Sequence, residues 1–228
     1  MTELKIQVRE LRIQGKSPKE IARALGVKPS VVAPLVREIA AETATTAEPE
    51  LIGCWISTGW SAGLSFDPAH GWHDEGAGQS VMPGWVSVLV ARRHGRDRAS
   101  IAGFLADVHC LGVKFTHGPE VMDEVQLRSA RDFVFSDYPG YQEAPIELAR
   151  QLVWGSTAYA ESLGFEAHTD LPELAGHLGA LEGPSVITFG RDGRPFYTPS
   201  PQDDADKVVR RLRSRVGDDF GYVVLDAG

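Results

Sequence analysis

The sequence is poor in the residues and runs that mark several large protein classes. Only two of its 228 residues are cysteine, Cys54 and Cys110, and because they form no CxxC pair we interpret them as buried thiols, not as a disulfide framework. No run of eighteen apolar residues is present, and the charged N-terminus lacks the apolar core of a secretory signal. We therefore expect a cytoplasmic protein with no membrane partner.

Motifs of common cofactor and catalytic sites are also missing. The glycines around Gly190 and Gly193 match neither a P-loop nor a dinucleotide fingerprint, so we expect no nucleotide or other cofactor. No serine or cysteine lies in a nucleophile-elbow motif, so the sequence offers no recognisable nucleophile for covalent catalysis. These absences favour a non-enzymatic function.

Negative charge is in excess, but it is unevenly distributed. The formal net charge is −8, yet residues 1–40 hold eight Lys and Arg against four Glu, and the rest of the chain holds 15 against 27 acidic residues. A basic head on an acidic body is typical of a protein that docks on nucleic acid through its head alone. An ordinary solvated helical face would explain the same surplus.

Residues 18–37 carry the strongest motif. Gly26 lies four residues after Ala22, and Val32 lies ten residues after Ala22. This is the internal spacing of a helix-turn-helix. A small side chain is needed at Ala22, where two helices cross, and Gly26 allows the left-handed backbone that ends the first of them. We expect a preceding helix at 4–14 to complete a three-helix domain.

This segment resembles the helix-turn-helix of bacterial repressors and resolvases over residues 1–41. In that family the helix after the glycine enters the major groove and its first residues touch bases. Pro34 departs from the pattern, because it takes a position that commonly faces the bases and removes a backbone donor. The resemblance implies base contacts by Lys28, Ser30, Val31 and Ala33, and phosphate contacts by Lys16, Lys19, Arg23 and Arg37.

The remainder of the chain predicts a linker at 42–50 and an α+β body at 51–228 with a mainly antiparallel sheet. The glycine-rich stretch 65–84 reads as a long loop and is the part least expected to be ordered. Expected strands are 51–57, 85–93, 99–113, 186–189, 195–198 and 221–225. Expected helices are 123–133, 145–163, 170–178 and 202–216.

Three local signals define these elements further. Asp123 is expected to cap its helix, and Asp170 with Glu173 forms the pattern of a capping box. Asp192-Gly193 is the strongest short hairpin signal in the chain and predicts that the two strands beside it pair with each other.

The body is also similar to a group of bacterial proteins of unknown function. The similarity lies in FLADVHCLGVK at 104–114, LVWGSTAYAESLGFEAH at 152–168 and FGRDGRPFY at 189–197, and it extends over residues 84–225. It implies a self-contained domain and, because the group has no established activity, no chemistry.

Two clusters of polar residues are candidates for chemistry. Asp107 and His109 are two apart on an expected strand, so they share a face and could form a general-base pair, with Lys114 on the opposite face. A satisfied polar pair at the end of a sheet would look the same.

His70, His73 and Asp74 form the second cluster, and such side chains bind zinc or other transition metals. Their spacing matches no standard site and the surrounding glycines predict mobility, so we expect no metal.

Taken together, the sequence predicts a nucleic-acid-binding regulatory protein of bacterial type, with DNA favoured over RNA. Since one head contacts few phosphates, either a homodimer or a second contact surface is expected. Two alternatives stay open. One is an RNA- or ribosome-associated factor that uses the same head as its docking surface, and separately Phe196 and Tyr197 in the body could stack on RNA bases as a second nucleic-acid contact. The other is an enzyme with a site around Asp107, His109 and Lys114.

Overall fold

The protein divides into two compact units, residues 1–49 and 50–228, which we call the head and the body. The computed structural model describes residues 3–13, 16, 18–32, 34–36, 48–80 and 82–223. The candidate residues Ala33 and Arg37, positions 42–47 of the expected linker and the end of the last expected strand lie outside the described residues. Within the described ranges, every helix is too short or too polar to cross a membrane.

The head consists of short helical segments around a small apolar core. Helix α1 spans Glu3–Ile13, α2 spans Pro18–Ala24, and residues 29–32 and 34–36 are also helical. Since these segments are too short to be stable alone, they depend on the side chains that they bury together. The fully or almost fully buried members of this core are Val8, Ile21, Ala22 and Val32.

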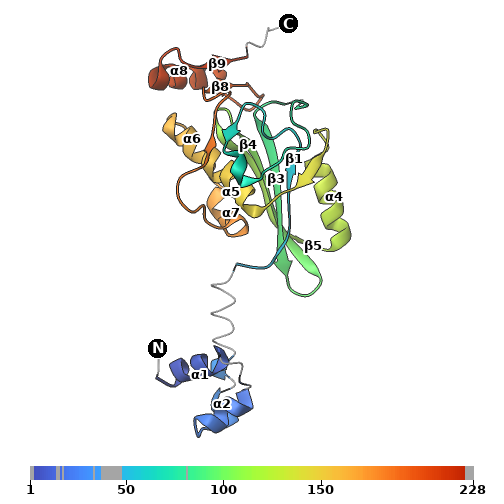
Figure 1. The fold of residues 1–228 in the computed structure, drawn as a ribbon, viewed down its shortest axis with the longest axis vertical. Coiled ribbons are helices and arrows are strands. Elements are labelled where there is room, and N and C mark those ends of the chain that lie inside the picture. Colours follow the sequence, from blue (N-terminus) through green and yellow to red (C-terminus); the bar gives the residue numbers. More distant parts are fainter. Residues whose placement is uncertain are drawn as a thin grey trace. The chain divides into compact units, whose positions relative to one another are not determined.

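The body is an α+β structure built on a five-stranded sheet in which every neighbouring pair is antiparallel (Figure 1). The strand order is β5 (Gly112–Met122), β4 (Arg98–Asp107), β3 (Trp85–His94), β1 (Leu51–Ser57) and β6 (Tyr141–Glu143). The expected hairpin of β3 and β4 is confirmed, with Trp85 opposite Asp107 and His94 opposite Arg98. The expected strand 99–113 is too long, because the chain turns at 108–111 before β5 begins.

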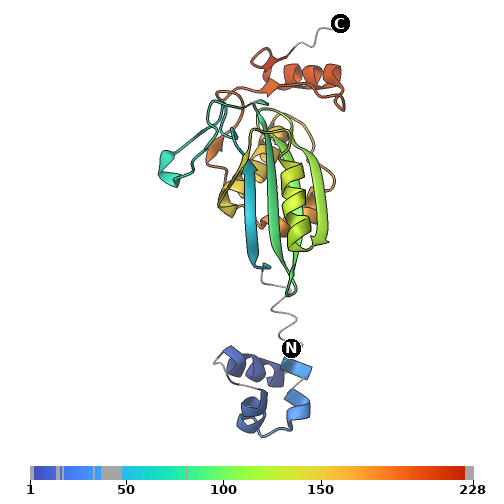
Figure 2. The ribbon, with the colours of Figure 1, turned by 90° about the vertical axis from the view of Figure 1, so that its right-hand side faces the viewer.

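Helices cover both faces of this sheet (Figure 2). Alternate residues of β3 point to opposite sides, so Val88 and Val90 join one core while Leu89 and Ala91 join the other. Helix α4 (Glu124–Val134) packs on the second side. The first side carries α5 (Ile146–Arg150), η2 (Gln151–Gly155), α6 (Ser156–Ser162) and α7 (Leu171–Leu178).

The helix signals in the sequence give mixed results. Asp123 forms a full capping box, because its carboxylate accepts from Gln126 N at 2.9 Å and the Gln126 side chain accepts from Asp123 N at 3.0 Å. The predicted helix 145–163 is present as α5, η2 and α6, with a π-helical stretch in its middle. The prediction of a capping box at Asp170 is wrong, because the side chain of this residue makes no hydrogen bond to the helix.

The predicted hairpin at Asp192-Gly193 is correct in its turn and wrong in its strands. Asp192 and Gly193 have φ values of 55° and 80°, and a single bridge joins Arg191 to Arg194. The flanking strands then diverge to different partners, so no hairpin extends from the turn. Strand β7 (Ile187–Thr188) pairs with β2 (Ser65–Phe66), and β8 (Phe196–Tyr197) pairs in parallel with β9 (Gly221–Tyr222) after α8 (Ala205–Val216).

The described residues of the glycine-rich stretch, which we expected to be poorly ordered, have a defined course held by buried and half-buried bonds. The carboxylate of Asp74 accepts from Gly59 N at 2.7 Å, Ser61 N at 2.9 Å and Gly76 N at 3.0 Å. Gln142 on β6 adds bonds to the backbone of the same stretch, including one to the carbonyl of His73 at 2.6 Å. The short helix η1 (Pro68–His70) lies between β2 and these contacts.

Candidate functional sites

The turn of the head has the geometry of a glycine-terminated helix. Gly26 has φ of 64°. The N–H of Val27 donates to the carbonyl of Ala22 at 3.0 Å, and the N–H of Gly26 donates to that of Arg23 at 3.4 Å. These two bonds define a Schellman motif, which reverses the chain after a helix. Ala22 itself is only 2% exposed, so its methyl group packs in the core as its small size requires.

The side chains of residues 28–31, just after this turn, are exposed. Residues 29–32 are helical, and the N–H of Val31 donates to the carbonyl of Lys28 at 2.9 Å, which makes Lys28 the residue before the helix. The exposed side chains of its first turn are therefore available to a partner. Those at predicted base-contact positions are Lys28, Ser30 and Val31.

The predicted phosphate contacts within the described residues lie on α2 and just before it. Lys19 and Arg23 are exposed on α2, four residues apart and so on one side of the helix. Lys16 precedes α2 and is half-buried, with its N–H donating to the carbonyl of Leu11 at 3.1 Å. Pro34 lies inside the helical segment and cannot donate to the carbonyl of Ser30, so this turn is weakened.

The predicted metal cluster has other partners. Both carboxylate oxygens of Asp74 are occupied by the loop bonds described above. The ring of His70 stacks on Trp72 with centroids 4.6 Å apart. Among the described residues, no three His, Cys, Asp or Glu side chains lie close enough to hold a metal ion.

Asp107, at the end of β4, bonds to the turn that follows and not to the imidazole of His109. Its Oδ1 accepts from the backbone N–H groups of His109 and Cys110, each at 3.0 Å. Its Oδ2 is buried and has no hydrogen-bond partner in the described structure. Burial raises the pKa of the Asp107 carboxyl to about 7. Because the strand ends here, the two-residue period that placed Asp107 and His109 on one face does not continue.

His109 is held between loops at the end of the sheet and is 2% exposed. Its Nε2 lies 2.8 Å from the carbonyl oxygen of Ala62, and since a carbonyl only accepts, Nε2 carries the hydrogen. Burial lowers the pKa of the imidazole, so Nδ1 keeps a lone pair. No described residue bonds to Nδ1. A Cβ at Gly84 would lie 2.3 Å from this atom, so only glycine fits there.

Lys114 on β5 faces the C-terminal segment. Its Nζ bonds to both carboxylate oxygens of Asp203, at 2.7 and 2.9 Å, and to Ser200 Oγ at 2.9 Å. The hydroxyl of Tyr197 also contacts Asp203, at 3.3 Å, and Tyr197 is fully buried. Tyr197 therefore has no free face on which a base could stack. The three catalytic candidates thus lie in one region, but each bonds to a different partner.

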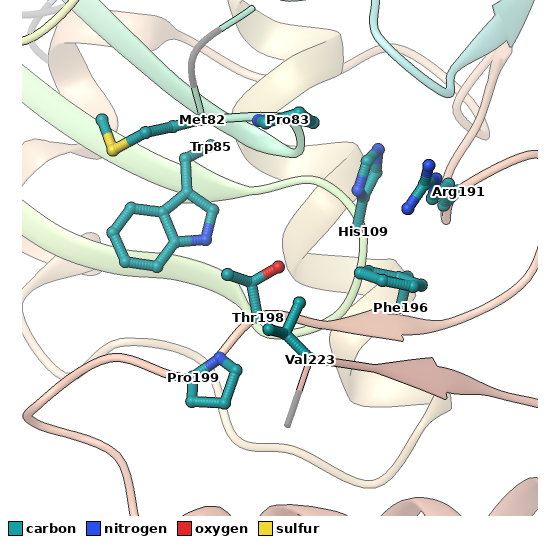
Figure 3. A pocket seen from close by; sticks show the side chains of 9 residues that line it. All are labelled: Met82, Pro83, Trp85, His109, Arg191, Phe196, Thr198, Pro199 and Val223. Atoms are coloured by element: carbon teal, nitrogen blue, oxygen red, sulfur yellow. The ribbon is translucent and has the colours of Figure 1, made fainter. Parts of the chain in front are cut away.

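A pocket of about 390 Å³ opens at this end of the body, next to His109 (Figure 3). The sequence did not reveal it, because its walls come from segments more than a hundred residues apart and no local pattern marks them. Its lining consists of Met82, Pro83, Trp85, His109, Arg191, Phe196, Thr198, Pro199 and Val223.

Comparison with protein-family models, curated proteins and solved structures produced no match. A functional assignment thus depends on the geometry of the head and of the pocket.

Proposed function

We propose that the protein is a DNA-binding regulator in which the head acts as a helix-turn-helix and the body serves as an effector or dimerisation domain. The observation that carries this proposal is the combination of buried Ala22, left-handed Gly26 and an exposed first turn in the next helix. The first two fix how the two helices meet, and the third leaves side chains free for a groove.

Charge supports a contact made by the head alone. The exposed cations Lys19, Arg23 and Lys28 belong to a segment with a surplus of positive charge, whereas the rest of the chain is acidic. Phosphates attract the basic head and repel the acidic rest of the chain. This difference orients the protein on a DNA duplex. Base contacts then fall to Lys28, Ser30 and Val31.

A single head of this size neutralises too few phosphates for tight binding at physiological salt. Two heads on one site would multiply the contacts, so the protein binds DNA as a homodimer through its bodies, with two half-sites about one helical turn apart.

The test is to crosslink the full chain to nucleic acid in cells, recover what is bound, and digest separate samples with DNase and RNase. Recovered DNA enriched in a short paired sequence is the expected result, and Lys28→Ala with Ser30→Ala should abolish the enrichment. Lys207→Ala on α8 is the control and should keep it. Recovery of RNA alone would replace this proposal by the RNA-associated alternative.

A further inference from the structure

The pocket beside His109 joins the start of the sheet to the C-terminal segment. Trp85 begins β3, His109 lies in the turn after β4, and Phe196 belongs to β8. Backbone bonds fix these walls, since Phe196 N donates to the carbonyl of His109 at 3.1 Å and Val223 N donates to that of Tyr197 at 3.0 Å. The pocket is therefore largely preformed, as small-molecule sites usually are.

Most of the pocket wall is apolar. Trp85 stands on one side, and in Figure 3 the edge of its indole that carries the nitrogen faces Thr198. Lys114 lies 4.9 Å from the centre of the Trp85 ring and is anchored by Asp203, which limits movement of the ring. Because the rings of Trp85 and Phe196 belong to this wall, an aromatic or other apolar ligand part suits it, and about 390 Å³ holds roughly a dozen non-hydrogen atoms at the ~30 Å³ that a water molecule takes.

One positive charge lies at the rim. The guanidinium of Arg191 sits 4.7 Å from the centre of the Phe196 ring, and no described carboxylate pairs with it. The neighbouring Arg194 differs, because its Nε lies 2.7 Å from Asp219 Oδ1. Stacking on an aromatic ring orients a guanidinium while leaving its N–H groups available to an anion.

His109 adds a neutral polar wall beside this charge. Figure 3 shows the imidazole next to Arg191, on the side of the pocket opposite Trp85. Its Nε2–H is taken by Ala62, and Nδ1 is a buried acceptor with no partner in the described structure. The site thus offers one cation and no competing negative charge among its described lining residues.

We propose that this pocket binds a small aromatic monocarboxylate, with the carboxylate on Arg191 and the ring between Trp85 and the apolar wall. A single cation matches a single negative charge, and the apolar walls disfavour a polyanion such as a nucleotide. This inference does not depend on DNA binding by the head.

The experiment is a titration of the full chain with phenylacetate and indole-3-acetate, monitored by calorimetry for both acids and by tryptophan fluorescence for phenylacetate alone, because indole-3-acetate itself emits like tryptophan. We expect both acids to bind and their neutral amides to bind about 10- to 100-fold more weakly, because a charge-assisted bond is lost. Trp85→Phe should remove most of the fluorescence change. If neither acid binds at concentrations up to about 10 mM, or if the amides bind equally well, the proposal is wrong.

Two arginine variants make the test specific. Arg191→Gln should weaken binding of the acids by about 10- to 100-fold and leave binding of the amides unchanged. Arg194→Gln is the matched control, since it removes the same charge three residues away and should leave both affinities unchanged. Equal losses in the two variants would indicate general electrostatic attraction and would overturn the assignment to Arg191. Circular dichroism of each variant verifies that it is folded.

Discussion

Lys114 on β5 and Asp203 before α8 form an ion pair that ties the C-terminal segment to the central sheet. The two side chains are only 11% and 12% exposed, and Nζ lies 2.7 Å from Oδ2. In a pair so removed from water, each charge offsets the cost of burying the other. Either charge alone would lie buried without a partner.

Loss of one member of this pair should therefore cost more than loss of both. We expect Lys114→Met to lower the free energy of unfolding by about 3–5 kcal/mol, and Lys114→Met with Asp203→Leu to recover part of it. Urea denaturation of the single and double variants measures both values. Arg128→Met breaks an exposed ion pair with Glu124 and is the control. It should lower the free energy of unfolding by less than about 1 kcal/mol. A cost that small for Lys114→Met would show that water already solvates the pair.

The buried carboxyl of Asp107 should make stability depend on pH. Its pKa is raised to about 7 by burial, whereas an unfolded aspartate titrates near 3.9, so between these values the folded state holds one more proton. This group's contribution to the free energy of unfolding therefore falls as pH rises, by up to about 1.4 kcal/mol per unit.

Asp107→Asn cannot ionise and should remove this dependence. The free energy of unfolding of the variant minus that of the natural chain should increase from about pH 4 to 7 and stay constant above. Denaturation curves at each pH give the difference. Asp97→Asn, the same substitution at an exposed position, is the control for the change of side chain itself. A flat line for Asp107→Asn would mean that the carboxyl is ionised in the folded protein.

Gly26 should be needed for its backbone conformation and not for space. A Cβ at this position would meet nothing within 4 Å, but φ is 64°. We expect Gly26→Ala to destabilise the head by about 1–2 kcal/mol and Gly26→Asn by less, because asparagine tolerates the left-handed region. Hydrogen exchange of the Ile21 and Val32 amides reports on the head within the full chain.

Gly176 in α7 provides the matched control for this substitution. A Cβ there also meets nothing within 4 Å, but the residue is helical, so Gly176→Ala should stabilise the body by about 0.5–1 kcal/mol. Opposite signs at the two glycines are expected, and unchanged exchange in Gly26→Ala would remove the argument for the turn.

The proposed phosphate contacts predict a change in salt dependence. Replacing Lys19 and Arg23 together by glutamine should weaken DNA binding and flatten the slope of log K against log salt by up to about 2 units. Arg96→Gln with Arg128→Gln removes the same charge from exposed positions of the body and should leave the slope unchanged. A slope that stays the same in the α2 variant would show that these residues do not touch phosphate.

The sequence predicted those elements that depend on neighbouring residues. The helix cap at Asp123, the hairpin of β3 and β4, and the left-handed turn at Asp192-Gly193 are each encoded within a few positions. Strand pairing across long separations was not predictable in this way, because the two-residue strands β7 and β8 carry no local signal of their distant partners, β2 and β9.

The candidate site shows the same limit. The period of two that joined Asp107 to His109 depends on a strand that in fact ends at Asp107. The partner of Lys114 lies 89 positions later, and Asp74 becomes a loop anchor through contacts with Gly59 and Ser61. Residue type identified these side chains as candidates, but only the tertiary structure shows which partner each one bonds to.

The divergence of β7 and β8 at the Asp192-Gly193 turn has a mechanical consequence. The described residues after this turn, 194–223, include β8, α8 and β9, and they supply one side of the pocket without joining the five-stranded sheet. Displacing this segment would require breaking the Lys114–Asp203 ion pair and the bond from Phe196 N to the carbonyl of His109, and it would open the cavity while the five-stranded sheet kept all its strands. A ligand bound in the cavity would hold this segment in place. Slower deuterium exchange along α8 would then show that the ligand has bound.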